Sequence, residues 1–248
     1  MIDLILSAHS PQKPFPISGQ LKRIKKLGMD YPVIFDEIIE LDRDSVLNIV
    51  EAPSYSTKEK FFAILLWGIF FEVAQKQPKL KLLQWLDSPN VDRELKRRFD
   101  RIINEKSPSA LFDDFNAELK IPGLGYAYFT KIFYFIRKAN NEPVYPILDK
   151  WLMCAFCAVS GGLYGNREVY MRFMKPKHGH KFDGILRRKK STAYQEYVTF
   201  IHKLSIEYQM EVDVIEEKLF GVSLKEDKTE NNPRIMYLNW ALSSDLDI

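Results

Sequence analysis

The fourteen-residue run "GLGYAYFTKIFYFI", at positions 123–136, constrains the fold more than any other part of the chain. Twelve of its positions are glycine, aromatic or aliphatic, and the other two are Thr130 and Lys131. A helix that is apolar on nearly every side has to be surrounded by other elements. Hydrophobic residues make up 46% of the chain and aromatic residues 13%, which is enough to build such a surrounding core. The run therefore predicts a buried helix at about 125–138.

Apolar spacing and capping signals predict further helices along the chain. Ser56 and Glu59 form a capping box ahead of a long buried helix at 57–76. Other helices are expected at 79–87, 90–105, 108–119, 149–159, 192–208 and 213–220, the last capped by Asp213. Residues 1–33 hold four prolines and one basic piece, "LKRIKK", and are expected to be irregular. We find no strand-like alternation, so the sequence predicts an all-α protein.

Composition narrows the class of protein. No basic stretch leads into an apolar run at the N-terminus, and the longest apolar run, at 61–71, is too short to span a bilayer. Two cysteines provide no disulfide framework and fit a reducing compartment. We therefore expect a soluble, intracellular, cytoplasmic protein that makes no use of a membrane.

The two cysteines, Cys154 and Cys157, form a C-x-x-C inside an apolar stretch, with His178 and His180 further on. A zinc site is conceivable, but the spacing matches no standard zinc pattern. Two buried thiols packed as small hydrophobic groups fit better, so we predict no metal and no cofactor.

Lys131 is unusual in its apolar surroundings. Burial disfavours the charged ammonium, and a neutral lysine amine is a nucleophile that can form a Schiff base. The alternative is a lysine whose stem lies on apolar surface while its head reaches water. Two nearby features favour the first interpretation. "IPGLGY" exposes backbone N–H groups at a helix start, which suits a phosphate. Asp149, in "YPILDKWL", lies 18 residues after Lys131 at another helix start. An aspartate that only caps a helix would give the same sequence pattern at position 149.

Together these features resemble the helix-hairpin-helix DNA glycosylases, whose usual motif is Leu-Pro-Gly-Val-Gly-x-Lys followed by Pro-Val-Asp. "IPGLG" matches the hairpin and "YPILD" matches the proline–aspartate element, and the resemblance covers residues 119–155. The usual lysine position holds Ala127 here, while Lys131 lies one helical turn later on much the same face. In this respect the chain looks more like the archaeal-type 8-oxoguanine glycosylases.

The resemblance implies a two-lobed helical bundle, with the active site in the cleft between the lobes, and a glycosylase-like domain over 1–248 whose catalytic segment is 119–159. It implies a base-excision enzyme that removes 8-oxoguanine from double-stranded DNA and cleaves the strand through a lysine Schiff base. Lys131 would be the nucleophile and Asp149 its partner. The hairpin residues Gly123, Leu124, Gly125 and Tyr126 would hold a DNA phosphate, with a monovalent cation bound at the hairpin. We also expect a monomer associated with the nucleoid.

The segment 175–190 carries seven Lys or Arg and one acid, a local charge of +6. On DNA, Lys175, Lys177, Arg187 and Arg188 would follow the backbone, although a solvated loop would have the same composition. Three alternatives to the bifunctional enzyme stay open. If Lys131 misses the pocket, the enzyme would rely on the aspartate and a water. The chain could also be a non-catalytic helix-hairpin-helix DNA-binding module, or an all-α protein unrelated to DNA.

Overall fold

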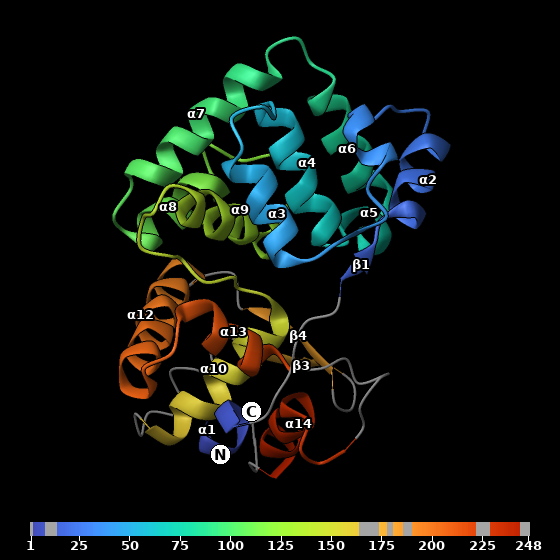
Figure 1. Ribbon diagram of the computed structural model, residues 1–248. Helices are drawn as coiled ribbons and strands as arrows, with labels where there is room; N and C mark the ends of the chain where they lie inside the picture. The colour runs from blue at the N-terminus through green and yellow to red at the C-terminus, as the bar shows by residue number, and fades with distance from the viewer. Residues whose placement is uncertain are drawn as a thin grey trace. The chain divides into compact units, whose positions relative to one another are not determined.

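The structure is a computed structural model that describes residues 2–7, 14–163, 174–177, 181–185, 190–221 and 229–243. The chain divides into two compact units (Figure 1). Lys13–Tyr145 is called here the hairpin unit, and Met1–Gln12 with Pro146–Ile248 is called the terminal unit. Helices dominate both units, so the all-α prediction is confirmed. The single domain over 1–248 and the cleft between lobes stay predictions.

The hairpin unit is built mainly from helices. They are α2 (Ser18–Lys26), the short 3-10 helix η1 (Val33–Asp36), α3 (Arg43–Glu51), α4 (Thr57–Trp67), α5 (Phe70–Val73), α6 (Lys76–Leu86), α7 (Val91–Asn104), α8 (Pro108–Asn116) and α9 (Tyr126–Ala139). Strand β1 (Phe15–Pro16) pairs with β2 (Glu40–Leu41) in an antiparallel arrangement. The irregular stretch expected over 1–33 is therefore wrong at α2, where the basic piece is helical.

The core of the hairpin unit lies around α4 and α9, which contact each other and also pack on α3 and α7 (Figure 1). The predicted capping box starts α4: the Ser56 hydroxyl accepts from the Glu59 N–H, and the Glu59 carboxylate accepts from the Ser56 N–H. Every residue from Phe61 to Trp67 is buried. The central buried helix expected from the sequence is confirmed as α9, most of whose residues from Phe129 onward are buried.

The predicted helix over 57–76 is wrong in its extent. α4 ends at Trp67, Gly68 caps it, and Ile69 takes a left-handed conformation with φ of 50° before α5 starts. A β-branched residue is rarely left-handed, and an isolated apolar pattern gives no sign of such a break. Tertiary packing at Gly68, described below, accounts for it.

The terminal unit contains α1 (Ile2–Ser7), α10 (Lys150–Leu163), β3 (Met174–Lys177), β4 (Lys181–Ile185), α12 (Lys190–Tyr208), α13 (Val212–Phe220) and α14 (Pro233–Ser243). Helix α10 packs against α12, α13 and α14, and α1 packs on α13 (Figure 1). The apolar face predicted for α12 is buried at Tyr194, Tyr197, Ile201 and Leu204, whereas its last predicted member, Tyr208, is only half-buried. The prediction that the chain has no strands is wrong here, because β3 and β4 form an antiparallel pair within the basic segment. The predicted cap of α13 is also wrong: Glu211 is the N-cap residue, and Asp213 lies in the first turn of the helix.

Candidate functional site

The Pro-Gly-x-Gly turn joins α8 to α9 in the hairpin unit. Leu124 N–H donates to the Ile121 carbonyl (3.1 Å), and Gly123 between them has φ of +79°. Proline at the second position and a left-handed glycine at the third are typical of a type II turn. Gly125 then caps α9 with extended backbone and has no side chain to offer. The first N–H groups of a helix have no acceptor within it, so this helix start can accept an anion.

Two neighbours fix the turn in place. A Cβ on Gly123 would come within 2.1 Å of the Pro78 carbonyl oxygen, so only glycine allows α6 to approach this closely. Arg98 of α7, which is buried, donates to the Leu119 carbonyl (3.0 Å) and the Lys120 carbonyl (3.4 Å). The turn is therefore held by α6 and α7 as well as by its own sequence. Its identity as a helix-hairpin-helix motif stays a prediction.

Lys131 lies half-buried on α9, where its stem crosses the break between α4 and α5. A Cβ on Gly68 would lie 3.0 Å from Lys131 Cδ and 3.2 Å from Cε. The absence of a side chain at Gly68 therefore makes the channel in which the lysine stem lies. The break in the predicted long helix and the lysine in the apolar helix belong to one feature, called here the lysine seat: Gly68, Trp67 and Lys131.

The head of Lys131 lies over an aromatic ring. Its Nζ is 5.4 Å from the centroid of Trp67, and the Arg43 guanidinium is 5.5 Å from the same ring and 4.7 Å from that of Tyr134. An aromatic face attracts an ammonium, whereas a like charge near the same ring opposes it. The neutral amine expected from the sequence stays a prediction.

Asp149 of the terminal unit is the N-cap of α10, as predicted. Its Oδ1 accepts from the N–H groups of Trp151 (2.8 Å) and Leu152 (2.9 Å). Oδ2 has no hydrogen bond to any residue in the described part of the chain. The side chain is half-buried, so this oxygen is the one that can act on another group. Lys131 and Asp149 belong to different units, and their pairing stays a prediction.

The approach to Asp149 is anchored by two side chains that the sequence did not single out for this role. Glu216 of α13 is 1% exposed and its carboxylate accepts from the Ile147 N–H. The Tyr194 hydroxyl of α12 donates to the Pro146 carbonyl (3.1 Å). A glutamate in an amphipathic helix normally predicts a solvated face, so only packing identifies Glu216 as an anchor.

The sequence patterns also did not identify Arg137, a buried arginine near the end of α9, as a structural anchor. Arg137 is 1% exposed and donates to the carbonyls of Pro143 (2.6 Å), Ile102 (2.8 Å) and Glu105 (2.9 Å). Its guanidinium lies 3.9 Å from the centroid of Tyr145. Arg137 therefore holds the end of the helix that carries Lys131.

The remaining predicted residues fall in the basic segment or around the cysteines. Lys175 and Lys177 lie on β3, while Arg187, Arg188, His178 and His180 lie outside the described residues. Cys154 and Cys157 are buried thiols not joined by a disulfide, as expected, and burial raises the pKa of the Cys157 thiol. Within the described ranges, no group of three or more His, Cys, Asp or Glu side chains could hold a metal ion. None of the described helices combines the length and apolar character that crossing a membrane requires.

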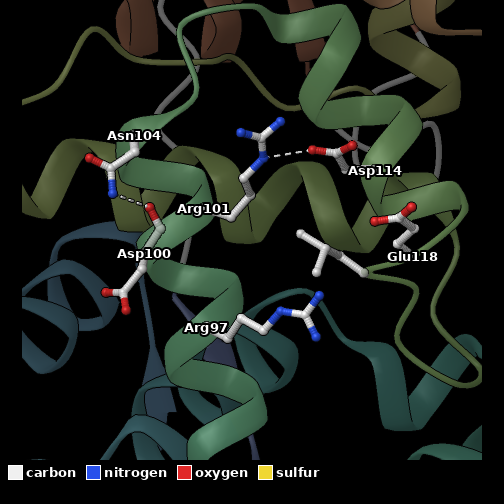
Figure 2. A pocket seen from close by; sticks show the side chains of 7 residues that line it. Arg97, Asp100, Arg101, Asn104, Asp114 and Glu118 are labelled. Atoms are coloured by element: carbon white, nitrogen blue, oxygen red, sulfur yellow. Dashed lines mark hydrogen bonds and ion pairs between the residues drawn. The ribbon is translucent and has the colours of Figure 1, made fainter.

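A polar pocket of about 420 Å³ lies on the hairpin unit between α7 and the end of α8 (Figure 2). Arg101 Nε is 2.7 Å from Asp114 Oδ2, and its other nitrogens reach Glu105 at 2.6 Å. Figure 2 also shows the Asn104 amide donating to the Asp100 carbonyl (2.7 Å). These charges neutralise one another, and neither Lys131 nor the turn glycines line the pocket, so we assign it no part in the chemistry.

The family model described as "Putative 8-oxoguanine DNA glycosylase OGG-like protein" matches residues 19–220. That range includes the turn, Lys131 and Asp149. No curated protein and no solved structure matches the chain.

Proposed function

The chain belongs to the OGG-like 8-oxoguanine DNA glycosylase family, and from this premise we propose that it excises 8-oxoguanine from double-stranded DNA with Lys131 as nucleophile. The observation that carries the proposal is the lysine seat, inside the matched range: a half-buried lysine whose stem lies in a channel formed by a glycine. A lysine needed only for solubility would not require a helix break beneath it.

The bond changes follow from the chemistry of an amine. The Lys131 nitrogen bonds to the sugar C1′ as the glycosidic bond breaks, and the base leaves with the electron pair and takes a proton. Asp149 Oδ2 accepts the proton that the lysine nitrogen loses, while Oδ1 stays bonded to α10. The nitrogen then forms a double bond to C1′ as the C1′–O4′ bond breaks and O4′ takes a proton, which gives the protonated Schiff base. The Schiff base permits β-elimination, in which the sugar C2′ loses a proton and the 3′ C–O bond breaks, so that the 3′ phosphate leaves.

The turn supports the proposal because it offers backbone N–H groups to a phosphate without basic side chains. In this proposal the N–H groups at Gly123 to Tyr126 grip a phosphate of the damaged strand, with a monovalent cation on the turn carbonyls. The target nucleotide is flipped out of the duplex at a cost of a few kcal/mol, which is recovered in pocket contacts. Lys175, Lys177, Arg187 and Arg188 then follow the backbone.

Strained backbone beside the lysine seat adds support. Ile69, next to Gly68, is left-handed with φ of 50°. Such a conformation costs roughly 1–3 kcal/mol and persists where the surrounding structure enforces it, often at functional sites. Here the strain ends α4 at Gly68, which leaves the channel for the lysine.

Borohydride trapping on a duplex with one 8-oxoguanine tests the nucleophile. We expect a covalent adduct with the wild type and none with Lys131→Gln. Lys138→Gln is the matched control, because this lysine is also half-buried on α9 and lies over an aromatic ring, 5.8 Å from Tyr134. An adduct that persists in Lys131→Gln would remove Lys131 from this role. Excision by that variant without an adduct would favour an enzyme that activates water.

Asp149 is tested separately. Asn keeps an oxygen for the cap, so Asp149→Asn should fold normally, bind the duplex like the wild type and lose excision severely. If Asp149→Asn excises the base as fast as the wild type, Asp149 serves only as a helix cap. Salt-dependent duplex binding with no excision by the wild type itself would instead fit a non-catalytic DNA-binding module.

A further inference from the structure

A second, smaller pocket on the hairpin unit is almost entirely basic. It has a volume of about 220 Å³ and lies between the end of α2 and the first turn of α6. Its lining residues are Arg23, Lys26, Leu27, Lys76 and Lys79. Four cations around one hollow repel each other unless an anion lies among them.

Lys79 is the most constrained of these cations. It is only 9% exposed, and within the described ranges its ammonium has no ion pair and no hydrogen bond. Burial and the charge of Arg23 lower its pKa, and Glu72 only partly offsets this from a distance. The stem of Lys79 is therefore buried while its ammonium still reaches the surface of the pocket, where it is open to a ligand.

The other residues around the pocket also favour an anion there. Arg23 is held at the edge by Glu72, whose carbonyl accepts from its guanidinium at 2.7 Å. Lys76 is the first residue of α6, and Gln75 before it makes no side-chain cap. The N-terminus of a helix carries partial positive charge, which adds to the field of the four side chains.

The position of the pocket relates it to the turn. Pro78 precedes Lys79 in the first turn of α6, and its carbonyl is the atom against which Gly123 packs. The basic pocket and the turn between α8 and α9 therefore share one helical turn of α6 as a common wall.

From these observations we propose that the pocket of Arg23, Lys26, Lys76 and Lys79 binds a phosphate group, and that on DNA it takes a backbone phosphate other than the one held by the turn. The DNA assignment rests on the proposed function, whereas the phosphate chemistry rests on the pocket alone. The Lys79 ammonium has no ion pair within the described ranges, and a bound phosphate would supply its counter-charge.

The test uses the full chain with an undamaged duplex, so that it does not depend on excision. The variant is Lys76→Gln/Lys79→Met, and the matched control is Lys81→Met, an exposed lysine of α6 outside the pocket. Affinity is measured by fluorescence anisotropy over a series of KCl concentrations. Losing one phosphate contact should lower the slope of log K against log salt by about 1 and weaken binding about tenfold at low salt.

Stability provides a check on the fold. Because Met keeps the apolar stem that Lys79 buries, Lys79→Met alone should melt near the wild-type temperature. Weaker DNA binding by the variant could then not be attributed to unfolding. Inorganic phosphate should raise the melting temperature of the wild type above that in chloride of equal ionic strength, and should not do so for the double variant.

The outcomes separate the possibilities. Loss of affinity and slope in the double variant, with Lys81→Met close to the wild type, supports the proposal. Equal behaviour of the double variant and the control overturns the DNA assignment; if phosphate still protects only the wild type, the pocket takes free phosphate instead. If phosphate protects neither protein more than chloride does, the phosphate pocket is overturned. Failure of borohydride trapping would argue against Lys131 as the nucleophile. It would not change the expected DNA affinities, salt slopes or melting temperatures.

Discussion

The contact between Gly68 and Lys131 gives the sharpest prediction for the reaction. Replacing Gly68 with alanine puts a Cβ 3.0 Å from Lys131 Cδ and 3.2 Å from Cε. Ordinary carbon–carbon contacts lie at about 3.5–4.0 Å, so the lysine stem has to move by roughly 0.5–1 Å. The backbone at Gly68 has φ of −70°, which alanine adopts freely. The substitution should therefore move the lysine while leaving the fold intact.

A displacement of about 1 Å at a reacting group can cost roughly a hundredfold in rate. We expect Gly68→Ala to slow single-turnover excision and adduct formation by about 10- to 100-fold, with the duplex affinity unchanged and the melting temperature shifted by only a few degrees. Gly19→Ala is the matched control, because a Cβ there meets nothing within 4 Å. A wild-type rate in Gly68→Ala, together with inactive Lys131→Gln, would refute the reasoning that Gly68 positions the lysine.

Three further predictions concern the fold around the site. Arg137→Met should lower the free energy of unfolding in urea by about 3–5 kcal/mol, since the carbonyls of buried Ile102, half-buried Glu105 and exposed Pro143 lose a charged donor, at roughly 1–3 kcal/mol each where water cannot replace it; a loss as small as that in the exposed Arg93→Met would contradict this. Gly123→Ala should cost about 2–4 kcal/mol because of its φ of +79° and its close carbonyl contact, whereas Gly125→Ala, with open space around it, should melt near the wild-type temperature. The hydrogen bonds that Asp42 accepts at the start of α3 lower its carboxyl pKa below 3.8, so its charge stabilises the fold above that pH and the benefit is lost as pH falls through the lower, folded-state pKa. In urea titrations, the advantage of the wild type over Asp42→Asn should therefore be constant near neutral pH and shrink as the pH falls below about 4, and an advantage independent of pH would exclude this origin.

The proposed phosphate pocket and the lysine seat differ in what they require of the fold. The seat is made by a missing side chain and a strained junction. The pocket gathers four like charges, of which Arg23 forms an ion pair with Glu72 at 3.5 Å. Both features lie in the hairpin unit, and strain and like-charge repulsion both work against stability. Residues kept at a cost to stability are the ones we expect to serve binding or catalysis.

Local chemistry made several elements predictable. The capping box of Ser56 and Glu59, the N-cap of Asp149 and the left-handed glycine of the turn each depend on residues within a few positions of one another. Apolar periodicity likewise identified α9 as a core helix and the buried face of α12. These signals survive folding because the same residues satisfy the same backbone groups in any surroundings.

Long-range packing decided the rest. Nothing near Gly68 in the sequence indicates that a lysine 63 positions away will lie against it, or that Ile69 will turn left-handed to end the helix. Glu216 and Arg137 resemble surface residues until their partners, far along the chain, bury them. The sequence by itself determined most of the core helices, the caps at Ser56 and Asp149 and the residue types of the candidate site, because those depend on neighbours along the chain. Only the tertiary structure decided which side chains share a channel, an anchor or a basic pocket, because close packing joins residues that no local pattern connects.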